Sequence, residues 1–462
     1  MPFNSFENYP MSWKPSIDKG KRTLYKTLAG HLEEDILNGK ILPGTKLPPQ
    51  RELADYLDVN VSTISKAFKL CELKGLLNAT IGSGTYVSFD ALSNARLLAE
   101  DTPTHIIQMG TTVPDCDANK FIMQMLKGVI AEQGAEKLFS YTSPNDTLWQ
   151  KDAAVLWMKK CGFSTNSENI LFANGGQNAI TAVLTGLFKY GDRMGVSPHT
   201  YSDMKAAANM LGIQLVPIDF IGNKGELNSE ELMYTCKKNN LKGIYIIPDH
   251  QNPTTFTMSV KSRKILGDVA RKQKLIIIED GTYQLLSTLK SAIASFAPEN
   301  TIYIASLSKA IAPGLRLAYV SVPEQYKMQI SNALYHMNIS VSPLMAGLAA
   351  RLMLSGQVEK VLEIHRKKNM IRNEIVNRYL AEFDCRGEAT GIFRWLLLPK
   401  NISGAEFETL AYEHGVQVYA AERFAVGNTI PERAVRIAVC GTDSIEELEQ
   451  GLRILKKLLN SL

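Results

Sequence analysis

The stretch Tyr303-Ile304-Ala305-Ser306-Leu307-Ser308-Lys309 ends an apolar run with two serines and a lysine. It is followed by Ala312-Pro313-Gly314-Leu315-Arg316, which brings a second cation close in sequence. Burial and a neighbouring cation both lower the pKa of a lysine, which leaves a neutral amine able to form a Schiff base. The serines and Arg316 are suited to a phosphate. Ser-x-Ser-Lys alone is equally consistent with a solvated lysine at a strand end, but the Pro-Gly-x-Arg after it favours the functional interpretation.

The chain around this stretch alternates apolar runs with helical patterns from His105 onward. Such alternation predicts an α/β fold with a mostly parallel sheet that is covered on both faces. The predicted strands are Ile170–Ala173, Met194–Ser197, Gln214–Ile218, Gly243–Pro248, Leu275–Glu279, Thr301–Ala305 and Leu317–Val322, and helices between them include Asn178–Leu187 and Ser202–Leu211. A long helical stretch from Pro343 to Glu382 and two further strands, Phe393–Leu398 and Val435–Val439, predict a smaller C-terminal domain.

Polar residues follow several of these strands at the ends where a parallel sheet binds ligands. Asn174-Gly175-Gly176-Gln177 marks a strand-to-helix turn, where free backbone amides and the helix dipole favour an anion. Asp280 ends the run Leu275–Glu279, and a buried carboxylate is costly unless it is paired. Asn252 lies in a polar segment after another strand. Each feature alone is consistent with an ordinary polar strand end, but their common order favours one shared site.

Together these motifs resemble the fold-type I aminotransferases, which bind pyridoxal phosphate through a lysine. The resemblance implies a Schiff base at Lys309 and a phosphate site at the Asn174–Gln177 turn. It also implies that Asp280 pairs with the protonated pyridine nitrogen and that Arg436, inside the run Val435–Val439, binds the carboxylate of an amino acid. The cofactor-binding residues implied are Gly175, Gly176, Gln177, Tyr201, Asn252, Asp280, Tyr283, Ser306, Ser308, Lys309 and Arg316. In this set Tyr201 stacks on the ring, while Asn252 and Tyr283 hold its oxygen; a core aromatic is the alternative for Tyr201.

The first 88 residues have the layout of a winged helix-turn-helix: a helix from Thr23, a helix over Gln50–Leu57, a third over Ser62–Leu73, and a glycine-rich tip before a strand. The third helix is predicted to bury Ile64, Ala67, Phe68 and Leu73. Residues 24–87 resemble the GntR-family DNA-binding domain through Pro-Gly-x-x-Leu-Pro, Arg-Glu-Leu-Ala and Gly-Ser-Gly-Thr-Tyr-Val. The DNA-facing residues implied by this likeness are Arg51, Ser62, Thr63, Lys66, Gly82 and Gly84. Val61 and Ala79-Thr80-Ile81 stand where the family often has an arginine, which predicts weak binding per half-site.

Composition sets broad limits on the chain. A length of 462 residues predicts two or three domains, and the net charge of +5 neither requires nor excludes nucleic acid. The six scattered cysteines include no C-x-x-C pair, which favours free thiols in a reducing cytoplasm over a disulfide framework or a zinc ribbon. Histidines at ligand spacing are missing, so no metal site is expected. We expect neither a signal peptide nor a membrane span.

A winged helix joined to an aminotransferase-like domain resembles the MocR subgroup of GntR regulators. We therefore predict a winged helix-turn-helix domain at 1–88, a linker at 89–104 and an aminotransferase-like domain at 105–462. The resemblance implies a domain-swapped homodimer that binds double-stranded operator DNA and responds to a small amino-compound effector through pyridoxal 5'-phosphate. Two alternatives remain: a catalytically active aminotransferase that carries a DNA-binding head, and a sensor of pyridoxal phosphate itself, which Arg436 disfavours.

Overall fold

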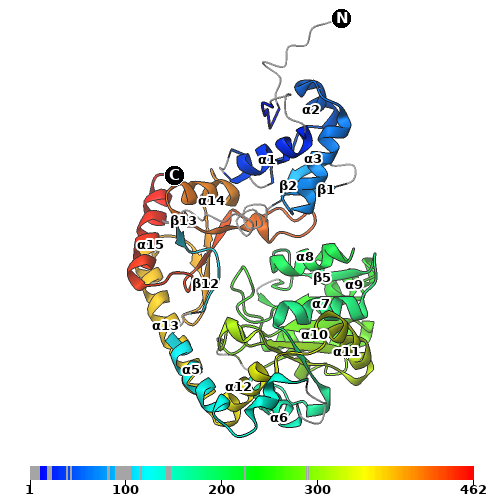
Figure 1. Ribbon diagram of the computed structural model, residues 1–462, viewed down its shortest axis with the longest axis vertical. Coiled ribbons are helices and arrows are strands. Elements are labelled where there is room, and N and C mark those ends of the chain that lie inside the picture. The colour runs from blue at the N-terminus through cyan, green and yellow to red at the C-terminus, as the bar shows by residue number, and fades with distance from the viewer. Residues whose placement is uncertain are drawn as a thin grey trace, which may run out of the picture. The chain divides into compact units, whose positions relative to one another are not determined.

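The computed structural model describes residues 11–17, 23–37, 40–41, 44–80, 84–88, 106–114, 117–141, 147–222, 225–287, 289 and 291–462. The chain divides into two compact units, whose elements are drawn in Figure 1. The first unit comprises residues 1–106 and 402–415, and the second comprises residues 107–401 and 416–462. The predicted linker at 89–104 and the predicted wing glycine Gly82 lie outside the described residues.

The first unit contains the predicted helix-turn-helix and wing. Its elements are α1 (Leu24–Leu37), α2 (Gln50–Leu57), α3 (Val61–Leu73), β1 (Leu77–Thr80), β2 (Gly84–Val87) and α14 (Gly404–Glu413). α1 and α2 both pack against α3, and β1 pairs with β2 in antiparallel register. The sequence pattern did not predict that α14 groups with this unit.

Two polar residues shape the turn between α2 and α3. Asp58 ends α2 with a φ of 50°, in the left-handed region that aspartate visits more readily than most residues. Asn60 then caps α3, because its side-chain oxygen accepts a hydrogen bond from the backbone amide of Ser62 at 2.8 Å. The short turn therefore fixes where α3 begins and which of its residues come first.

The buried face of α3 differs from the prediction at one position. Ile64, Ala67 and Phe68 are buried as predicted, whereas Leu73 is 77% exposed, so its assignment to the core was wrong. Leu73 lies nine residues after Ile64, and at about 100° per residue it falls on the opposite side of the helix. Cys71, two turns after Ile64, is buried and completes the apolar face instead.

A seven-stranded sheet forms the centre of the second unit. Its spatial order is β4 (Ile170–Ala173), β10 (Ala318–Ser321), β9 (Thr301–Ser306), β8 (Ile276–Asp280), β7 (Gly243–Ile246), β5 (Arg193–Val196) and β6 (Gln214–Pro217). β10 runs antiparallel to both of its neighbours, and all the other pairs are parallel. The predicted mostly parallel sheet is confirmed, and each strand boundary lies within two residues of its predicted position.

Helices surround this sheet, and we call the sheet with its helices the large lobe. Every residue of β7, β8 and β9 is buried, as expected for central parallel strands that are covered on both faces. The helices are α6 (Leu148–Lys160), α7 (Gly176–Leu187), α8 (Ser202–Met210), α9 (Ser229–Lys238), α10 (Val260–Gln273), α11 (Glu324–Asn338) and α12 (Pro343–Leu354). Two further helices, α5 (Asp117–Ile130) and α13 (Val358–Tyr379), pack against each other, and α5 also packs against α12.

The rest of the second unit, which we call the small lobe, contains a four-stranded antiparallel sheet. Its order is β11 (Cys385–Arg386), β12 (Phe393–Leu397), β15 (Ala434–Ala438) and β14 (Tyr419–Ala420), and α15 (Ile445–Asn460) packs with α13. A short parallel pair joins β3 (Ile107–Gln108) to β13 (Val416–Gln417). In the four-stranded sheet Arg436 lies directly opposite Trp395 on one side and Tyr419 on the other. The predicted smaller C-terminal α/β segment is therefore confirmed.

Among the residues that the structure describes, no helix combines the length and the apolar character that crossing a membrane requires.

Candidate functional site

Lys309 lies in the loop after β9, at the carboxyl end of the central strands. Its Nζ donates a hydrogen bond to the backbone carbonyl of Thr112. Burial lowers the pKa of Lys309, and the positive charges of Arg436 and Arg316 act in the same direction. The side chain therefore loses its proton at a lower pH than a lysine in water, which favours the nucleophilic amine.

The N-terminus of α7 forms an anion cradle together with two other segments. Gly175 precedes α7 with a φ of 88°, in the region that favours glycine. A Cβ atom at Gly175 would lie 2.8 Å from Nη2 of Arg316, and one at Gly176 would lie 3.2 Å from Cβ of Ser306. The two glycines thus let an arginine and a serine approach the free backbone amides of a helix start, where an anion binds favourably.

Gln177 and Ser308 belong to the segments of the same cradle. Gln177 Nε2 donates to the carbonyl of Asp203 at 3.0 Å, whereas its buried Oε1 has no hydrogen-bond partner among the described residues. The backbone amide of Ser308 donates to Ser306 Oγ at 3.4 Å, which orients that hydroxyl. Gln177 Oε1 is therefore an acceptor that the donor of a bound ligand would satisfy.

Asp280 is the last residue of β8 and is buried. Tyr245 donates its hydroxyl to Asp280 Oδ2 at 2.8 Å, and both the amide and the hydroxyl of Thr282 donate to Oδ1. Burial raises the pKa of Asp280, and these hydrogen bonds counteract the rise because they favour the charged form. The sequence pattern identifies Asp280, whereas it singles out neither Tyr245 nor Thr282.

The charge of Asp280 acts on two predicted aromatic residues, Tyr201 and Tyr283. Tyr201 precedes α8, and its hydroxyl donates to Asp203 Oδ2 at 2.7 Å. Tyr283 meets Phe393 of β12 edge to face, with ring centroids 5.5 Å apart. Burial raises the pKa of both tyrosine hydroxyls, and the charge of Asp280 raises each further. Both hydroxyls therefore stay protonated at neutral pH.

Arg436 is a buried cation on β15, in the small lobe. Its Nη1 donates to Asn252 Oδ1 at 2.6 Å and its Nη2 donates to the carbonyl of Gly110 at 2.7 Å. Its buried Nε has no hydrogen-bond partner, and no carboxylate pairs with it, within the part of the chain that the structure describes. Burial lowers the pKa of Arg436. Such a guanidinium is poised for an acidic group of a ligand.

Aromatic rings surround this guanidinium. The ring centroids of Phe424, Tyr419 and Phe393 lie 5.0, 5.3 and 5.6 Å from its Cζ atom. Cation–π contacts of this kind partly replace the water that burial removes. They also exclude bulk solvent, so an ion pair formed here would be stronger than one at the surface.

Cys440 follows β15 and belongs to the same cluster of charges, although the sequence pattern did not mark it. Burial raises the pKa of its thiol to about 11, while the positive charges of Lys309 and Arg436 oppose that rise. The thiol is therefore neutral at physiological pH, and it lines the site without adding charge.

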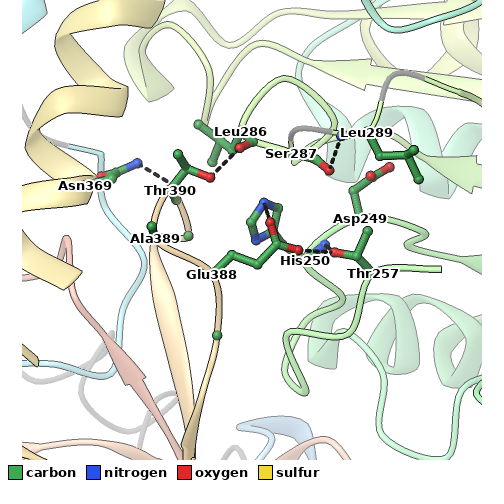
Figure 2. A network of polar contacts seen from close by, with 12 residues as sticks. Asp249, His250, Thr257, Leu286, Ser287, Leu289, Asn369, Glu388, Ala389 and Thr390 are labelled. Carbon is green, nitrogen blue, oxygen red and sulfur yellow. Dashed lines mark hydrogen bonds and ion pairs between the residues drawn. The ribbon is translucent and has the colours of Figure 1, made fainter. Parts of the chain in front are cut away.

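A polar network joins the loops of the large lobe to the small lobe (Figure 2). Thr257 Oγ1 donates to Glu388 Oε1 at 2.7 Å, and His250 Nε2 lies 3.6 Å from Glu388 Oε2. Thr390 Oγ1 donates to the carbonyl of Leu286 at 2.6 Å. The loops after β7 and β8, which carry Asn252 and Tyr283, are thus tied to the segment that leads into β12.

The predicted DNA-facing residues of the first unit lie on α2, α3 and the wing. Arg51, Ser62 and Lys66 are exposed, and Thr63 is partly exposed at the start of α3. Gly84 is exposed with a φ of 114°, and a Cβ atom there would lie 2.8 Å from Cε of Lys46. Lys46, which the motif did not single out, thus adds a cation beside the wing.

Two family models together span most of the chain. The model described as aminotransferase class I and II matches residues 104–455, and the one described as bacterial regulatory proteins, gntR family, matches residues 24–87. The uncharacterized HTH-type transcriptional regulator YdeF of Bacillus subtilis (strain 168) is 59% identical, with 100% of each chain covered. The chain belongs to this family of HTH-type regulators. Its two matched domains and their order confirm the predicted resemblance to the MocR subgroup.

A more distant relative agrees with this membership, and solved structures match the fold of the larger domain. The HTH-type transcriptional regulator NorG of Staphylococcus aureus (strain N315) is 23% identical over 80% of this regulator and 89% of NorG. An archaeal alanine:glyoxylate aminotransferase has a TM-score of 0.70 at 23% identity, covering 80% of this chain and 93% of its own. A Pyrococcus horikoshii kynurenine aminotransferase, solved in complex with PMP, has a TM-score of 0.69 at 22% identity, with 79% and 96% covered. These structures confirm the predicted fold-type I aminotransferase fold.

Proposed function

We propose that this regulator binds pyridoxal 5'-phosphate covalently at Lys309 and that a small amino compound bearing an acidic group then controls how it binds operator DNA. The observation that carries the proposal is Arg436. A buried guanidinium without a carboxylate partner among the described residues is costly on its own, and it shares its electrostatic environment with the half-buried Lys309. A ligand that joins the two groups removes that cost.

The residues of the site fit the cofactor. The cradle of Gly175, Gly176, Ser306 and Arg316 suits its phosphate, because it combines the backbone amides of a helix start with a hydroxyl and a cation. Asp280 suits the protonated ring nitrogen, since burial leaves this carboxylate in need of a cation. When bound, the cofactor supplies an electrophilic carbon and an electron-withdrawing ring.

Tyr201, Asn252, Tyr283 and Ser308 complete the proposed cofactor contacts. The Oδ1 atom of Asn252 accepts a hydrogen bond from Arg436, so the Nδ2 atom of Asn252 is left to donate to the oxygen of the cofactor ring. The protonated hydroxyl of Tyr283 is a second donor to that oxygen. Tyr201 offers its ring face at the start of α8. Asn252 would thus contact both the cofactor and Arg436, the residue proposed to bind the acidic group of the effector.

The covalent step needs no oxidant or reductant. Lys309 would hold the cofactor through its amine nitrogen, and the cofactor would supply the electrophilic carbon, with water as the by-product of the linkage. An effector amine would compete with Lys309 Nζ for that carbon and would leave the lysine as a free amine. The acidic group of that effector would pair with Arg436.

For the first unit we propose recognition of double-stranded DNA by α3 in the major groove. The proposed contacts are those of Arg51, Ser62, Thr63, Lys66, Gly82 and Gly84. We also propose the boundaries 1–88, 89–104 and 105–462 for the DNA-binding domain, the linker and the effector domain. The family models, which match 24–87 and 104–455, support these limits.

We further propose a homodimer in which the DNA-binding domains are exchanged between subunits. Large apolar side chains are exposed on the second unit, among them Phe139, Tyr141, Met328 and Tyr335. Exposed apolar surface of this kind is typical of an interface. Two tethered heads would also raise the effective concentration of the second half-site contact, which offsets weak binding per head.

An active aminotransferase remains the second candidate, and one observation favours it. Asp280 receives three hydrogen bonds that favour its charged form, and an anionic partner is what holds a ring nitrogen protonated for amino-group transfer. Lys309, Asp280 and Arg436 together would suffice for turnover. The regulator and the enzyme therefore differ in the event after ligand binding and not in the groups available.

Selection of bound duplexes from a random DNA library would first define the operator. The cofactor-loaded protein would then be titrated with α- and ω-amino acids while the cofactor absorbance, the operator affinity and the keto-acid product are measured. We expect an amino acid that changes both the absorbance and the operator affinity without sustained product formation. Steady multiple turnover without any change in operator affinity would establish the enzyme instead.

A further inference from the structure

The segment Gly110–Thr112, which we call the strap, accepts hydrogen bonds from both cations of the site. Lys309 Nζ donates to the carbonyl of Thr112, and Arg436 Nη2 donates to the carbonyl of Gly110 at 2.7 Å. One residue, Met109, separates the strap from the end of β3. Two side chains that the proposed cofactor and effector would engage are thus bound to one short piece of backbone.

The other side of the strap is held by the small lobe. The amide of Ala438 donates to the carbonyl of Met109 at 2.6 Å, and the Thr111 hydroxyl lies 3.0 Å from the Tyr419 hydroxyl. The fit is close, because a Cβ atom at Gly110 would lie 2.6 Å from Cε1 of Tyr419. The strap therefore has one position that satisfies both cations and Tyr419 together.

Loading of the site would compete with both of these contacts. Nζ of Lys309 carries two or three hydrogens as an amine or ammonium, and at most one once it is double-bonded to the cofactor's carbon. A carboxylate also accepts from a guanidinium more strongly than a backbone carbonyl does, and it can take two of its N–H groups at once. The cofactor thus weakens the Thr112 contact, and an acidic effector weakens the Gly110 contact.

We propose that the strap is the element that reports the state of the site to the DNA-binding domain. This inference rests on the function proposed above. Residues 89–105 alone separate the described end of the DNA-binding domain from the segment that leads through β3 into the strap. Loss of the Gly110 contact changes how the chain upstream is anchored, which gives an acidic effector a differential affinity for two states of the protein.

A matched pair of ligands isolates the contact between Arg436 and Gly110, because neither ligand forms a double bond to Lys309 and only one of them carries an acidic group. Pyridoxamine 5'-phosphate has the cofactor's phosphate and ring without an acidic group, whereas N-(5'-phosphopyridoxyl)-L-alanine adds a carboxylate on the same nitrogen. Hydrogen exchange of the peptide spanning 106–114 would be measured in the full-length protein with each ligand. We expect the adduct to speed exchange about fivefold more than pyridoxamine phosphate does, together with a change in operator affinity of about 5- to 150-fold.

Two variants test whether the strap carries the coupling. Gly110→Ala places a Cβ atom against Tyr419 at a position whose φ lies outside the left-handed region, so the change acts through the contact alone. Its operator affinity without ligand should approach that of the loaded wild type, and the adduct should then change it less than about twofold. Thr111→Val removes only the hydroxyl contact with Tyr419 and should reduce the response partially. Gly128→Ala on α5 adds a Cβ atom with no heavy atom within 4 Å and serves as the control.

The outcomes separate this inference from the proposed function. If the adduct fails to bind, or binds without changing operator affinity, the proposed function is wrong and the strap inference falls with it. If the adduct changes operator affinity while exchange at 106–114 stays constant, the strap inference alone is overturned. A wild-type response in folded Gly110→Ala and Thr111→Val proteins would also overturn it.

Discussion

The cations expected to bind ligands are exposed in the DNA-binding domain and enclosed in the effector domain. The cations expected to meet DNA, Arg51 and Lys66, are exposed, whereas Arg436 is 4% exposed and Lys309 is largely enclosed. An exposed charge contributes little to the free energy of unfolding, but a buried one must be paired. A substitution of an exposed cation in the DNA-binding domain should therefore change operator affinity alone. A substitution in the effector site should change both ligand affinity and the free energy of unfolding.

The largest effect is expected at Lys309, because the covalent link depends on one nitrogen atom. Borohydride reduction of the cofactor-loaded wild type should leave one pyridoxyl group per chain, and Lys309→Ala should abolish it, as read by mass spectrometry of peptides. Lys151 is the control, since burial also lowers the pKa of this lysine outside the site, and Lys151→Ala should keep the label. A label that persists in Lys309→Ala would place the link elsewhere.

Arg436→Ala should weaken binding of the phosphopyridoxyl-alanine adduct by about 10- to 100-fold, because a hydrogen-bonded charge pair is lost. Binding of pyridoxamine phosphate should hardly change. The unfolding free energy should also fall by about 1–3 kcal/mol, since Asn252 Oδ1 and the Gly110 carbonyl lose their donors. Arg433→Ala removes an exposed arginine from the same segment and should change neither quantity. If Arg436→Ala lost affinity equally for the adduct and for pyridoxamine phosphate, Arg436 would not be the residue that binds the carboxylate.

In the DNA-binding domain, Lys66→Ala should weaken operator binding by about tenfold if Lys66 contacts a phosphate. The slope of the logarithm of the operator binding constant against the logarithm of the salt concentration should then fall in magnitude by about one. The unfolding free energy should change by less than about 0.5 kcal/mol, because the side chain is exposed. Lys69→Ala is the matched change on the same helix, where Lys69 pairs with Glu72 at 3.1 Å, and its slope should change less. An unaltered slope in Lys66→Ala would remove Lys66 from the contact surface.

The smallest effect is expected at Glu279, which lies next to Asp280 on β8 and accepts from the amides of Ile293 and Ala294 at 2.8 and 2.9 Å. Burial raises the pKa of Glu279 to about 7 from an ordinary value of 4.5. A raised pKa in the folded state stabilises the protein at low pH, and this contribution is lost as pH rises through about 7.

Urea unfolding should therefore show a wild type less stable at pH 8 than at pH 6, with about 1 kcal/mol of the loss absent from Glu279→Gln. Glu299→Gln changes an exposed carboxylate in the same unit and should keep the wild-type difference between the two pH values. A loss of equal size in wild type and Glu279→Gln would assign the pH dependence to another group.

Much of the fold could be predicted because apolar strands end in polar residues that have no place in a core. Asp280 and Asn252 stand out for that reason, and the run after Ile302 points to Lys309. Tyr245 could not be recognised in the same way, since a tyrosine within Gly243–Ile246 looks like any apolar strand residue until the neighbouring strand places Asp280 beside it.

Other features of the structure could not be predicted from the chemistry of individual side chains. The strap contacts Lys309 and Arg436 through backbone carbonyls, which every residue has. Leu73 was misplaced because apolar character was followed without its helical phase. The grouping of residues 402–415 with the first unit depends on long-range packing, which local periodicity does not encode.

The register of the small sheet has an optical consequence. Trp395 lies directly opposite Arg436, is fully buried, and donates its indole N–H to Glu432 Oε2 at 2.7 Å. Its emission depends on the local field, and directly paired residues share one face of a sheet. Arrival of a negative charge at Arg436 would change that field, and a cofactor that absorbs in the near ultraviolet would quench the indole. The protein thus contains a native fluorophore beside the arginine, so occupancy of the site can be followed in real time without a label.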